Sequence, residues 1–354
     1  MNMIWKDLIR GAILGFVIPA MIMVGVVALP DSQLPSEQVE VPTTHPSSDF
    51  TQSTAITTPT VPNVTTEATE PSTEQPKPTI PEPSRMVWVF MDGQRVEMEL
   101  ESYVTGVVLA EMPASFSMET LKAQAVAART FAMYVCQIGR HDGAVCTDYC
   151  CCQAYLPQEQ YLQYYGGQQD LQKIQSAVQA TAGEVLTYGG EVICATYFSC
   201  SGGSTEAAIA VWGWEVEYLQ TVDSPGEEFA SVYSSTIVLS PEELEAALCL
   251  DLDGEPQSWF ETISYTDGGG VDTVQICGIP YRGTTFRTLL GLPSTMFEIT
   301  VQEQQICITT FGYGHRVGLS QYGAEAMALS GYGYWDILSH YYRNVALDIC
   351  SFEW

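Results

Sequence analysis

A run of 19 residues without a charged side chain, residues 11–29, constrains this chain most. A helix of that length rises about 28 Å, which is close to the hydrocarbon thickness of a membrane. Lys6 and Arg10 precede the run and Asp31 follows it, so the positive-inside rule places residues 1–10 in the cytoplasm and the remainder outside. A cleavable signal peptide is the alternative, but the run is long for one and no small-residue cleavage site follows. The sequence therefore predicts a single transmembrane anchor.

Residues 30–84 are rich in Pro, Thr, Ser and Glu and carry eight acidic residues against one basic residue, Lys77. Large apolar side chains are too few there to compensate for the loss of chain entropy on folding. We expect a disordered linker that tethers the folded region, residues 85–354, to the anchor.

The net charge of the chain is −29, with only 13 Lys and Arg among 354 residues. A nucleic-acid-binding protein neutralises several phosphates with clustered basic side chains. The large excess of acidic over basic residues therefore excludes nucleic-acid binding. It also disfavours docking onto anionic lipid surfaces. An uncharged or weakly charged glycan remains an acceptable partner.

From Arg85 onward, helical and strand patterns are mixed, and the predicted class is α+β. A turn at Asp92 and Gly93 between two apolar runs indicates a hairpin. The expected strands are 86–91, 95–100, 184–188 and 191–199, and the expected helices are 101–111, 118–137, 171–182, 242–248 and 334–342. Ser117 is the expected N-cap of the long helix. Residues 235–305, with short strands and Gly-rich turns, form a candidate accessory lobe.

Glu111 stands at the end of a short predicted helix, just before Met112 and Pro113. The negative end of the helix dipole and apolar neighbours such as Phe116 both disfavour an ionised carboxylate, so they raise the pKa of its side chain. A carboxylic acid that stays protonated near neutral pH can protonate a glycosidic leaving oxygen. The alternative is a solvated glutamate at a helix end.

Nine blocks of this sequence, in the same order, resemble the stage II sporulation protein D family. They are residues 103–108, 110–116, 121–130, 197–206, 211–213, 218–219, 222–225, 312–324 and 340–342. The resemblance implies a lytic transglycosylase of peptidoglycan, which cuts the MurNAc–GlcNAc β-1,4 bond without water and leaves a 1,6-anhydro-muramic end. Glu111 matches the family's catalytic glutamate. One carboxylate suffices where the substrate assists, an exception to the two-carboxylate scheme.

The resemblance also points to Arg129 as a catalytic residue. A buried guanidinium could orient Glu111 or hold a substrate carbonyl. The alternative, a structural ion pair on the long helix, carries equal weight.

Two Gly-rich segments are candidate sugar-binding surfaces, because glycines allow close approach of the backbone and small hydroxyls bond to sugars. The candidate residues are Ser201, Gly202, Gly203, Thr205, His315, Ser320, Gln321 and Tyr322. For His315, a structural hydrogen bond is favoured over acid–base chemistry. Arg316 stands where the family commonly has glycine, and we expect it in or beside the groove. Glu227 and Glu228 follow Pro225 where relatives often carry a base.

Four residues, His141, Cys146, Cys151 and Cys152, have the spacing and donor types of a tetrahedral zinc site. The clostridial branch of the family has a structural zinc in this insert, usually with two His and two Cys. Cys150 could replace a neighbour as ligand. Free or disulfide-bonded cysteines are the alternative.

Two other functions are alternatives to a lytic transglycosylase. A non-catalytic glycan-binding scaffold would stimulate a peptidoglycan amidase, for which the family implies stage II sporulation protein P as partner. A zinc hydrolase is disfavoured because a cysteine-dominated site is usually closed. The resemblance places the protein in forespore engulfment, as a single-pass membrane protein whose catalytic domain lies between mother cell and forespore.

Overall fold

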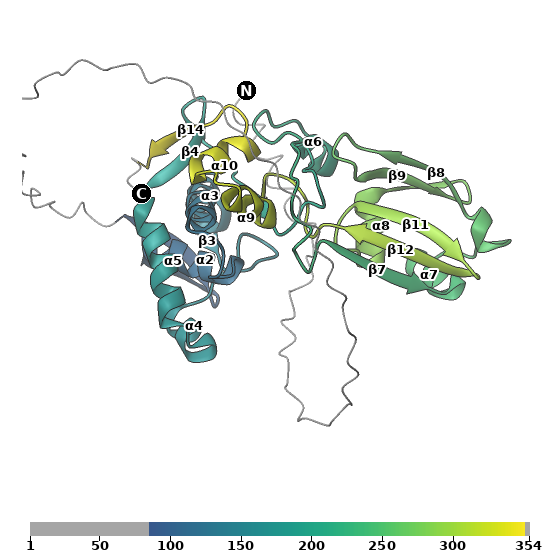
Figure 1. Cartoon of the computed structure of the whole chain (residues 1–354), viewed down its shortest axis with the longest axis horizontal. Coiled ribbons are helices and arrows are strands. Elements are labelled where there is room, and N and C mark those ends of the chain that lie inside the picture. Colours follow the sequence, from purple (N-terminus) through teal and green to yellow (C-terminus); the bar gives the residue numbers. More distant parts are fainter. Residues whose placement is uncertain (1–84, 351–354) are drawn as a thin grey trace, which may run out of the picture. The chain divides into compact units, whose positions relative to one another are not determined.

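The computed structural model describes residues 85–350, and the predicted anchor and linker lie outside them. Helices and strands are interspersed along this whole part, which confirms the α+β class. Figure 1 shows the helices α2, α5, α9 and α10 around a central helix, α3. Within residues 85–350, no helix is both long and apolar enough to cross a membrane.

The described part begins with the predicted hairpin, β1 (Met86–Met91) and β2 (Gln94–Glu99), which pair antiparallel. Asp92 and Gly93 both have positive φ, 52° and 77°, as a two-residue turn that matches strand twist requires. The short strand β3 (Val145–Cys146) pairs parallel with β1. This pairing brings the cysteine-rich insert back to the hairpin.

The helices α2 (Leu100–Glu111) and α3 (Met118–Gln137) match the predicted ranges within a residue. α3 is buried on almost every side, as expected of a helix that is apolar all round. Leu121, Ala125 and Ala128 face one hydrophobic core with α2, whereas Ala123 and Ala127 face a second core with α9 and α10. Ser117 precedes α3 but makes no side-chain cap. Ser117 is the N-cap residue, as predicted, but its hydroxyl donates to Glu325 instead of to the first turn of the helix.

Around this pair, the chain adds the following elements: the 3₁₀ turn η2 (Arg140–Asp142), α4 (Gln158–Tyr165), α5 (Gln168–Ala180), β4 (Glu184–Tyr188), β5 (Glu191–Val192), β6 (Tyr197–Phe198), α6 (Ala208–Trp212), β13 (Leu319–Ser320), α9 (Gln321–Leu329), α10 (Tyr334–Tyr341) and β14 (Ala346–Ile349). The strand predicted over 191–199 is thus broken. Its first two residues pair with β4, whereas β6 pairs parallel with β13. The C-terminal strand β14 takes the other edge of β4.

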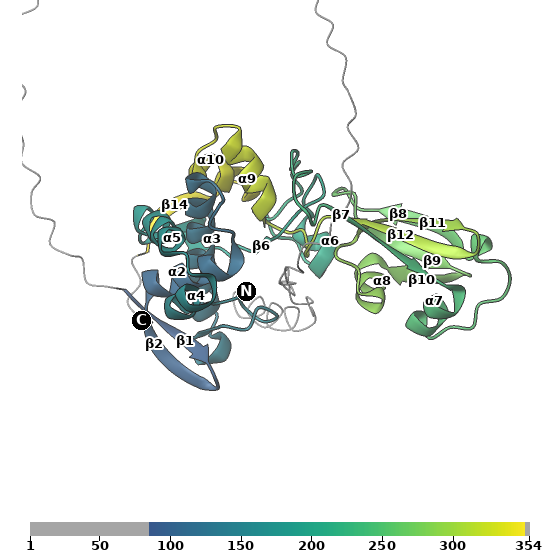
Figure 2. The same ribbon diagram turned by 60° about the horizontal axis from the view of Figure 1, so that its bottom comes forward.

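Residues 234–311 form a lobe with a hydrophobic core of its own, which includes Trp259, Phe286 and Phe297. The lobe has two antiparallel sheets, ordered β11-β12-β7 and β10-β9-β8. Its elements are β7 (Ser234–Leu239), α7 (Pro241–Leu248), η3 (Pro256–Ser258), β8 (Phe260–Tyr265), β9 (Val271–Ile276), β10 (Ile279–Arg282), α8 (Gly283–Leu290), β11 (Met296–Gln302) and β12 (Gln305–Phe311). Figure 2 shows α7 and α8 beside these strands.

A buried ion pair fastens the lobe to the rest of the described chain. Arg316 and Glu206 are 0% and 1% exposed in their side chains, and Nη1 lies 3.1 Å from Oε1. Arg316 also donates to the carbonyl of Gly268, and Glu206 accepts from Thr266 and Gly270 in the β8–β9 turn. The expectation that Arg316 lies in or beside a groove was therefore wrong, because its guanidinium turns inward to this carboxylate.

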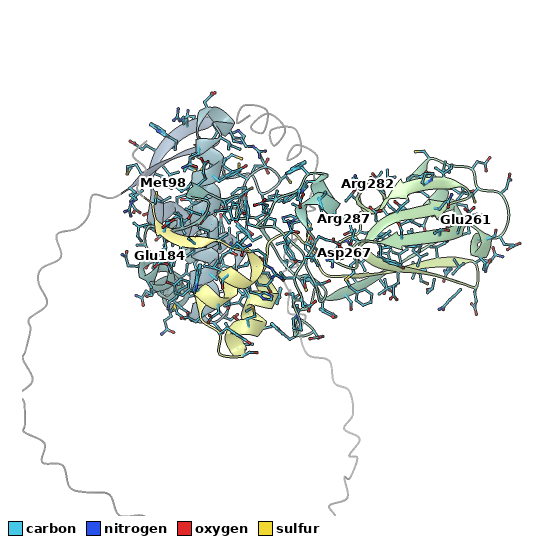
Figure 3. All side chains as sticks on the ribbon, turned by 90° about the horizontal axis from the view of Figure 1, so that it is seen from above. Met98, Glu184, Glu261, Asp267, Arg282 and Arg287 are labelled. Carbon is cyan, nitrogen blue, oxygen red and sulfur yellow. The ribbon has the colours of Figure 1, made fainter. Side chains whose placement is uncertain are left out.

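Figure 3 labels three side chains at the near end of the lobe, Asp267, Arg282 and Arg287, and one farther along it, Glu261. Arg282 donates to the carbonyl of Ala210 in α6. Arg287 donates within the lobe to the carbonyls of Leu292 and Pro293.

Candidate active site

Glu111 is the last residue of α2, and its carboxylate is held by groups from two other segments. The backbone N–H of Ala154 donates to Oε1 at 2.9 Å. The side-chain amide of Gln321, at the start of α9, donates to Oε2 at 3.5 Å. The Glu111 residue as a whole is partly exposed.

Burial of its carboxyl group raises the pKa of Glu111, while the bonds from Ala154 and Gln321 oppose the shift. The apolar neighbours that were expected to desolvate Glu111 are all buried in the core, namely Val108, Leu109, Met112 and Phe116. The site thus favours the protonated acid, as the proposed chemistry requires.

Behind Glu111 lies a chain of buried polar groups. Tyr197 donates its hydroxyl to Gln153 Oε1 at 2.8 Å, and Gln153 Nε2 donates to the Tyr103 hydroxyl at 3.0 Å. Burial raises the pKa of Tyr197 far above its ordinary value, and the neighbouring Glu111 carboxylate adds to this. Since Gln153 precedes Ala154, this network fixes the segment whose backbone holds the Glu111 carboxylate.

Three aromatic rings pack against one another in the order Phe116, Tyr322 and Phe229. The ring of Tyr322 packs edge-on against Phe116, with centroids 5.2 Å apart, and against Phe229, with centroids 5.6 Å apart. Phe229 is 53% exposed and lines a groove with a volume of about 700 Å³, between the 224–229 loop and α9–α10. Of the predicted sugar-binding residues, Gln321 contacts Glu111 directly, and its neighbour Tyr322 contacts Phe116.

The hydroxyls of Ser201 and Ser320 do not face a groove, so the prediction that they contact sugar was wrong. Both residues are 0% exposed. Each hydroxyl donates to Oε1 of Glu227, at 2.9 Å and 2.8 Å. Glu227, an acid where relatives often carry a base, is itself 0% exposed.

Gly202 and Thr205 are buried as well, and their expected sugar contacts are corrected for the same reason. Gly202 has φ of 78°, and an added Cβ would lie 2.9 Å from the backbone nitrogen of Gly312. Its close approach is to another chain segment, not to a ligand. The Thr205 hydroxyl accepts from the backbone of Val222. Gly203 is only partly buried, with φ of 121°, and its carbonyl accepts from the backbone N–H of Ser224.

His315 has the structural role that the sequence favoured. Its Nδ1 accepts from the backbone N–H of Val317 at 3.1 Å, and its ring packs against Phe198 and Trp212. Burial, aided by the Arg287 guanidinium, lowers the pKa of His315 to about 4. The ring is therefore neutral near pH 7.

Arg129 is not brought to Glu111. Its guanidinium, 0% exposed, forms an ion pair with Glu101 at the opposite end of α2 and donates to the carbonyl of Glu184. Ten residues of α-helix separate Glu101 from Glu111, which corresponds to about 15 Å. Of the two roles weighed for Arg129, the structural ion pair is the one whose contacts are present.

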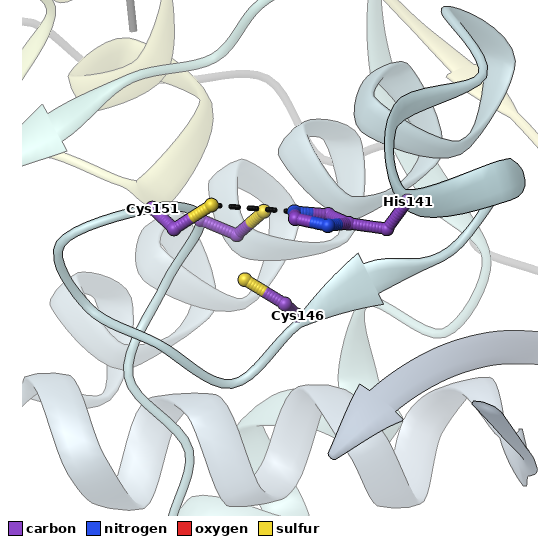
Figure 4. Close-up of side chains that lie close together, drawn as sticks. His141, Cys146 and Cys151 are labelled. Carbon is purple, nitrogen blue, oxygen red and sulfur yellow. Dashed lines mark hydrogen bonds between the residues drawn. The ribbon is translucent and has the colours of Figure 1, made fainter. Parts of the chain in front are cut away.

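The four predicted metal ligands converge. The ligand atoms of His141, Cys146, Cys151 and Cys152 all lie within 4.8 Å of one another. Figure 4 shows His141, Cys146 and Cys151 pointing toward one centre, with His141 Nε2 3.2 Å from Cys151 Sγ. Three sulfur atoms and one imidazole nitrogen are a donor set that suits tetrahedral zinc. Cys150 is not in this group.

The cysteine cluster and Glu111 are joined by a very short segment of chain. Cys152 is followed by Gln153, which anchors the polar network, and then by Ala154, which donates to Glu111. A rigid cluster at Cys152 would therefore hold the Glu111 carboxylate in place through two peptide units.

The family model described as Stage II sporulation protein matches residues 93–188, the segment that contains Glu111 and the cysteine cluster. Stage II sporulation protein D of Bacillus amyloliquefaciens is 38% identical over 284 residues, covering 78% of this chain and 82% of the relative. The chain belongs to the stage II sporulation protein D family. The Bacillus subtilis protein of the same name is 37% identical over 263 residues, covering 72% of this chain and 76% of the relative. An amidase enhancer of Bacillus subtilis is 30% identical over 301 residues, covering 68% of this chain and 40% of the relative.

Sequence reasoning missed several residues of this family member's site: Gln153, Ala154, Tyr197 as a neighbour of Glu111, and Glu227. Ala154 acts through its backbone, so its side chain gave no signal. Tyr197 and Gln153 are in contact although they lie 44 residues apart along the chain. For Glu227 a signal existed, because an acid stood where relatives often have a base.

Proposed function

We propose that this protein is a lytic transglycosylase that cleaves the MurNAc–GlcNAc β-1,4 bond of peptidoglycan. The observation that carries the proposal is Glu111, a partly exposed residue whose carboxyl group is desolvated enough for its pKa to rise. Glu111 accepts hydrogen bonds from a backbone N–H and a side-chain carboxamide, and neither of these groups is a second carboxyl group. A substrate that supplies its own assistance can use such a site.

The protonated Glu111 donates its proton to the glycosidic oxygen, and the bond from that oxygen to the anomeric carbon breaks. The 2-acetamido group of the substrate stabilises the positive charge that develops at the anomeric carbon. The Glu111 carboxylate then takes the proton from the C6 hydroxyl, whose oxygen bonds to the anomeric carbon. A 1,6-anhydro ring forms, and Glu111 ends the cycle protonated.

The glycan strand is expected to lie along the rings of Tyr322 and Phe229. Exposed aromatic faces are flat and apolar, and the groove of about 700 Å³ beside Phe229 is a surface that a polymer can follow. An acidic protein of net charge −29 suits a strand with few anionic groups better than one rich in phosphate.

A structural zinc ion would be held by His141, Cys146, Cys151 and Cys152. The convergence of three thiols and one imidazole supports this, and four protein ligands leave no open position for chemistry. When bound, the ion would stiffen the loop that ends at Ala154. A zinc hydrolase is therefore not proposed.

The biological setting follows from the family, whose members are sporulation proteins by name. We place this protein in forespore engulfment, anchored by residues 11–29 with its N-terminus in the cytoplasm. The catalytic domain would act on peptidoglycan between mother cell and forespore. A peptidoglycan amidase, stage II sporulation protein P, is the partner proposed to remove stem peptides beside it.

A second function is a non-catalytic scaffold that stimulates that amidase. The similarity to a protein named amidase enhancer favours it, although this chain covers only 40% of that relative. A scaffold needs glycan and amidase contacts but no protonated carboxyl group.

Isotope labelling tests the reaction class. Peptide-stripped glycan strands are incubated with the wild-type protein in H₂¹⁸O, and the masses of the newly formed muramic ends are measured by mass spectrometry. Transglycosylation predicts anhydro ends without ¹⁸O, because the C6 oxygen replaces water. One ¹⁸O per cut would show a hydrolase, and intact strands would favour the scaffold.

A further inference from the structure

The buried glutamate Glu227 accepts six hydrogen bonds, three on each carboxylate oxygen. The donors are the Cys200 thiol, the Ser201 backbone and hydroxyl, the Gly202 backbone, the Ser224 hydroxyl and the Ser320 hydroxyl. None of these donors is a cation. The charge of Glu227 also favours the protonated Arg316 guanidinium, whose pKa burial lowers, and the six donors replace water around the buried carboxylate.

These donors come from three separate segments. Residues 200–202 follow β6, Ser224 precedes Glu227 in its own loop, and Ser320 ends β13 immediately before α9. Glu227 therefore fixes the point where α9 begins. Gly323 in the first turn of α9 confirms how close this packing is, because an added Cβ would lie 2.5 Å from Glu227 Oε1.

The first residue of α9 is Gln321, whose amide reaches Glu111 at 3.5 Å. That distance is at the outer limit of a hydrogen bond, so a shift of α9 by a few tenths of an ångström would break the contact. Farther along α9, Glu325 accepts from Ser117 and Thr120 at the start of α3. The position of the first turn of α9 thus depends on Glu227, and the position of the next turn depends on α3.

We propose that Glu227 is a positioning residue that acts through Ser320 to hold Gln321 against the Glu111 carboxyl group. This inference rests on the proposed function, in which Glu111 is the acid. Glu227 does not contact substrate, since it is 0% exposed. Its effect on catalysis is expected to pass through the start of α9.

A double-mutant cycle between Glu227→Gln and Gln321→Ala tests the coupling. Each single change is expected to lower kcat/KM on peptide-stripped glycan by about three- to tenfold, the value of one hydrogen bond to a charged or polar group. If Glu227 acts through Gln321, the double variant is no slower than the slower single variant. A double variant whose loss in kcat/KM equals the product of the two single losses would overturn the proposal. So would a Glu227→Gln variant with wild-type kcat/KM and only a lower Tm.

Two further variants guard against a general loss of structure. Ser320→Ala removes the link between Glu227 and α9 without altering the buried carboxylate, and it should reproduce the loss and its non-additivity with Gln321→Ala. Glu206→Gln is the matched control, since Glu206 is equally buried but bonds to Arg316 and the lobe. Its effect should multiply with that of Gln321→Ala. A Glu206 variant that behaved like Glu227→Gln would overturn the assignment.

A titration of Glu111 separates failure of this inference from failure of the proposed function. Carboxyl ¹³C NMR reads the Glu111 pKa even in a protein that cleaves nothing. Loss of the Gln321 amide bond raises that pKa, since the bond lowers it. Tyr197, the ionisable side chain facing Glu111, stays neutral throughout because burial holds its pKa well above 10. The same upward shift in Glu227→Gln supports positioning, and an unchanged Glu111 titration refutes it.

Discussion

At the scale of single residues, Glu111 and Arg129 show how similar sequence signals lead to different roles. Both lie in helical blocks shared with the family, and both are largely enclosed by protein. Glu111 contacts an amide and a carboxamide and keeps some exposure. Arg129 is fully buried against Glu101. Only the long-range contacts distinguish a reactive acid from a structural ion pair.

Arg129→Met should destabilise the fold without disabling the chemistry. It leaves the largely buried Glu101 carboxylate without its partner, and breaking such a pair costs about 3–5 kcal/mol of unfolding free energy. Denaturant unfolding measures this, and kcat of the folded fraction should stay within about threefold of wild type. A catalytic arginine would instead show a stable protein with kcat reduced by orders of magnitude.

Glu111→Gln should stabilise the protein at alkaline pH. The raised pKa of Glu111 means that the fold favours the protonated form. Its contribution to stability is full below the unfolded-state pKa and is lost as pH rises through the folded-state pKa. Glutamine cannot ionise, so thermal unfolding at about pH 8 should show a higher Tm for the variant. The difference should vanish at low pH, and a variant with lower Tm at every pH would contradict the raised pKa.

At the scale of elements, helix α9 and the cysteine-rich loop both contact Glu111, each at a different carboxylate oxygen. α9 brings Gln321 and Tyr322, and the loop brings Ala154. Both elements are short and depend on contacts outside themselves for their placement. The site is therefore sensitive to changes in segments that never touch the substrate.

Helix ranges were predictable because a helical apolar pattern is local, as the match of α2 and α3 shows. The Gly-rich loops were not. Glycines and small hydroxyls suit close approach to a ligand or to another chain segment equally well. At Gly202 and Ser201 the partner is the chain itself. The convergence of His141, Cys146, Cys151 and Cys152 was predictable, since these four candidate ligands fall within twelve residues.

Removal of one metal ligand should distinguish the two candidate cysteines. Purified wild-type protein is expected to hold about one zinc per chain, as a four-ligand structural site does. Cys151→Ser should lose most of the zinc and unfold at a lower temperature, whereas Cys150→Ser should keep both. Metal content by mass spectrometry and Tm by calorimetry measure this. Equal zinc in both variants would refute the proposed ligand set.

At the scale of the whole molecule, the described chain combines a helical part around α3 with the lobe 234–311. The lobe has its own core, and the Arg316–Glu206 pair joins it to the loop after Ser201. The sequence indicated the lobe's approximate bounds from its Gly-rich turns. The pair could not be foreseen, because its two residues are 110 positions apart.

Arg316→Met should loosen the lobe from the rest of the chain. It leaves the Glu206 carboxylate buried without its partner, a loss of about 3–5 kcal/mol. Hydrogen exchange should then speed up most in the β8–β9 turn at 266–270, whose Gly268 carbonyl Arg316 holds. Unchanged protection of that turn would show that the pair is not what fastens the lobe.

The most direct test of Glu111 as the catalytic acid is a side-by-side digestion of peptide-stripped glycan strands by the wild-type protein and Glu111→Gln. Glutamine keeps the size of the side chain and removes its proton. Mass spectrometry should find 1,6-anhydro-muramic ends with the wild type and a loss of at least about 10²-fold with the variant, as expected when a general acid is removed. Anhydro ends formed equally by both proteins would contradict the assignment of Glu111.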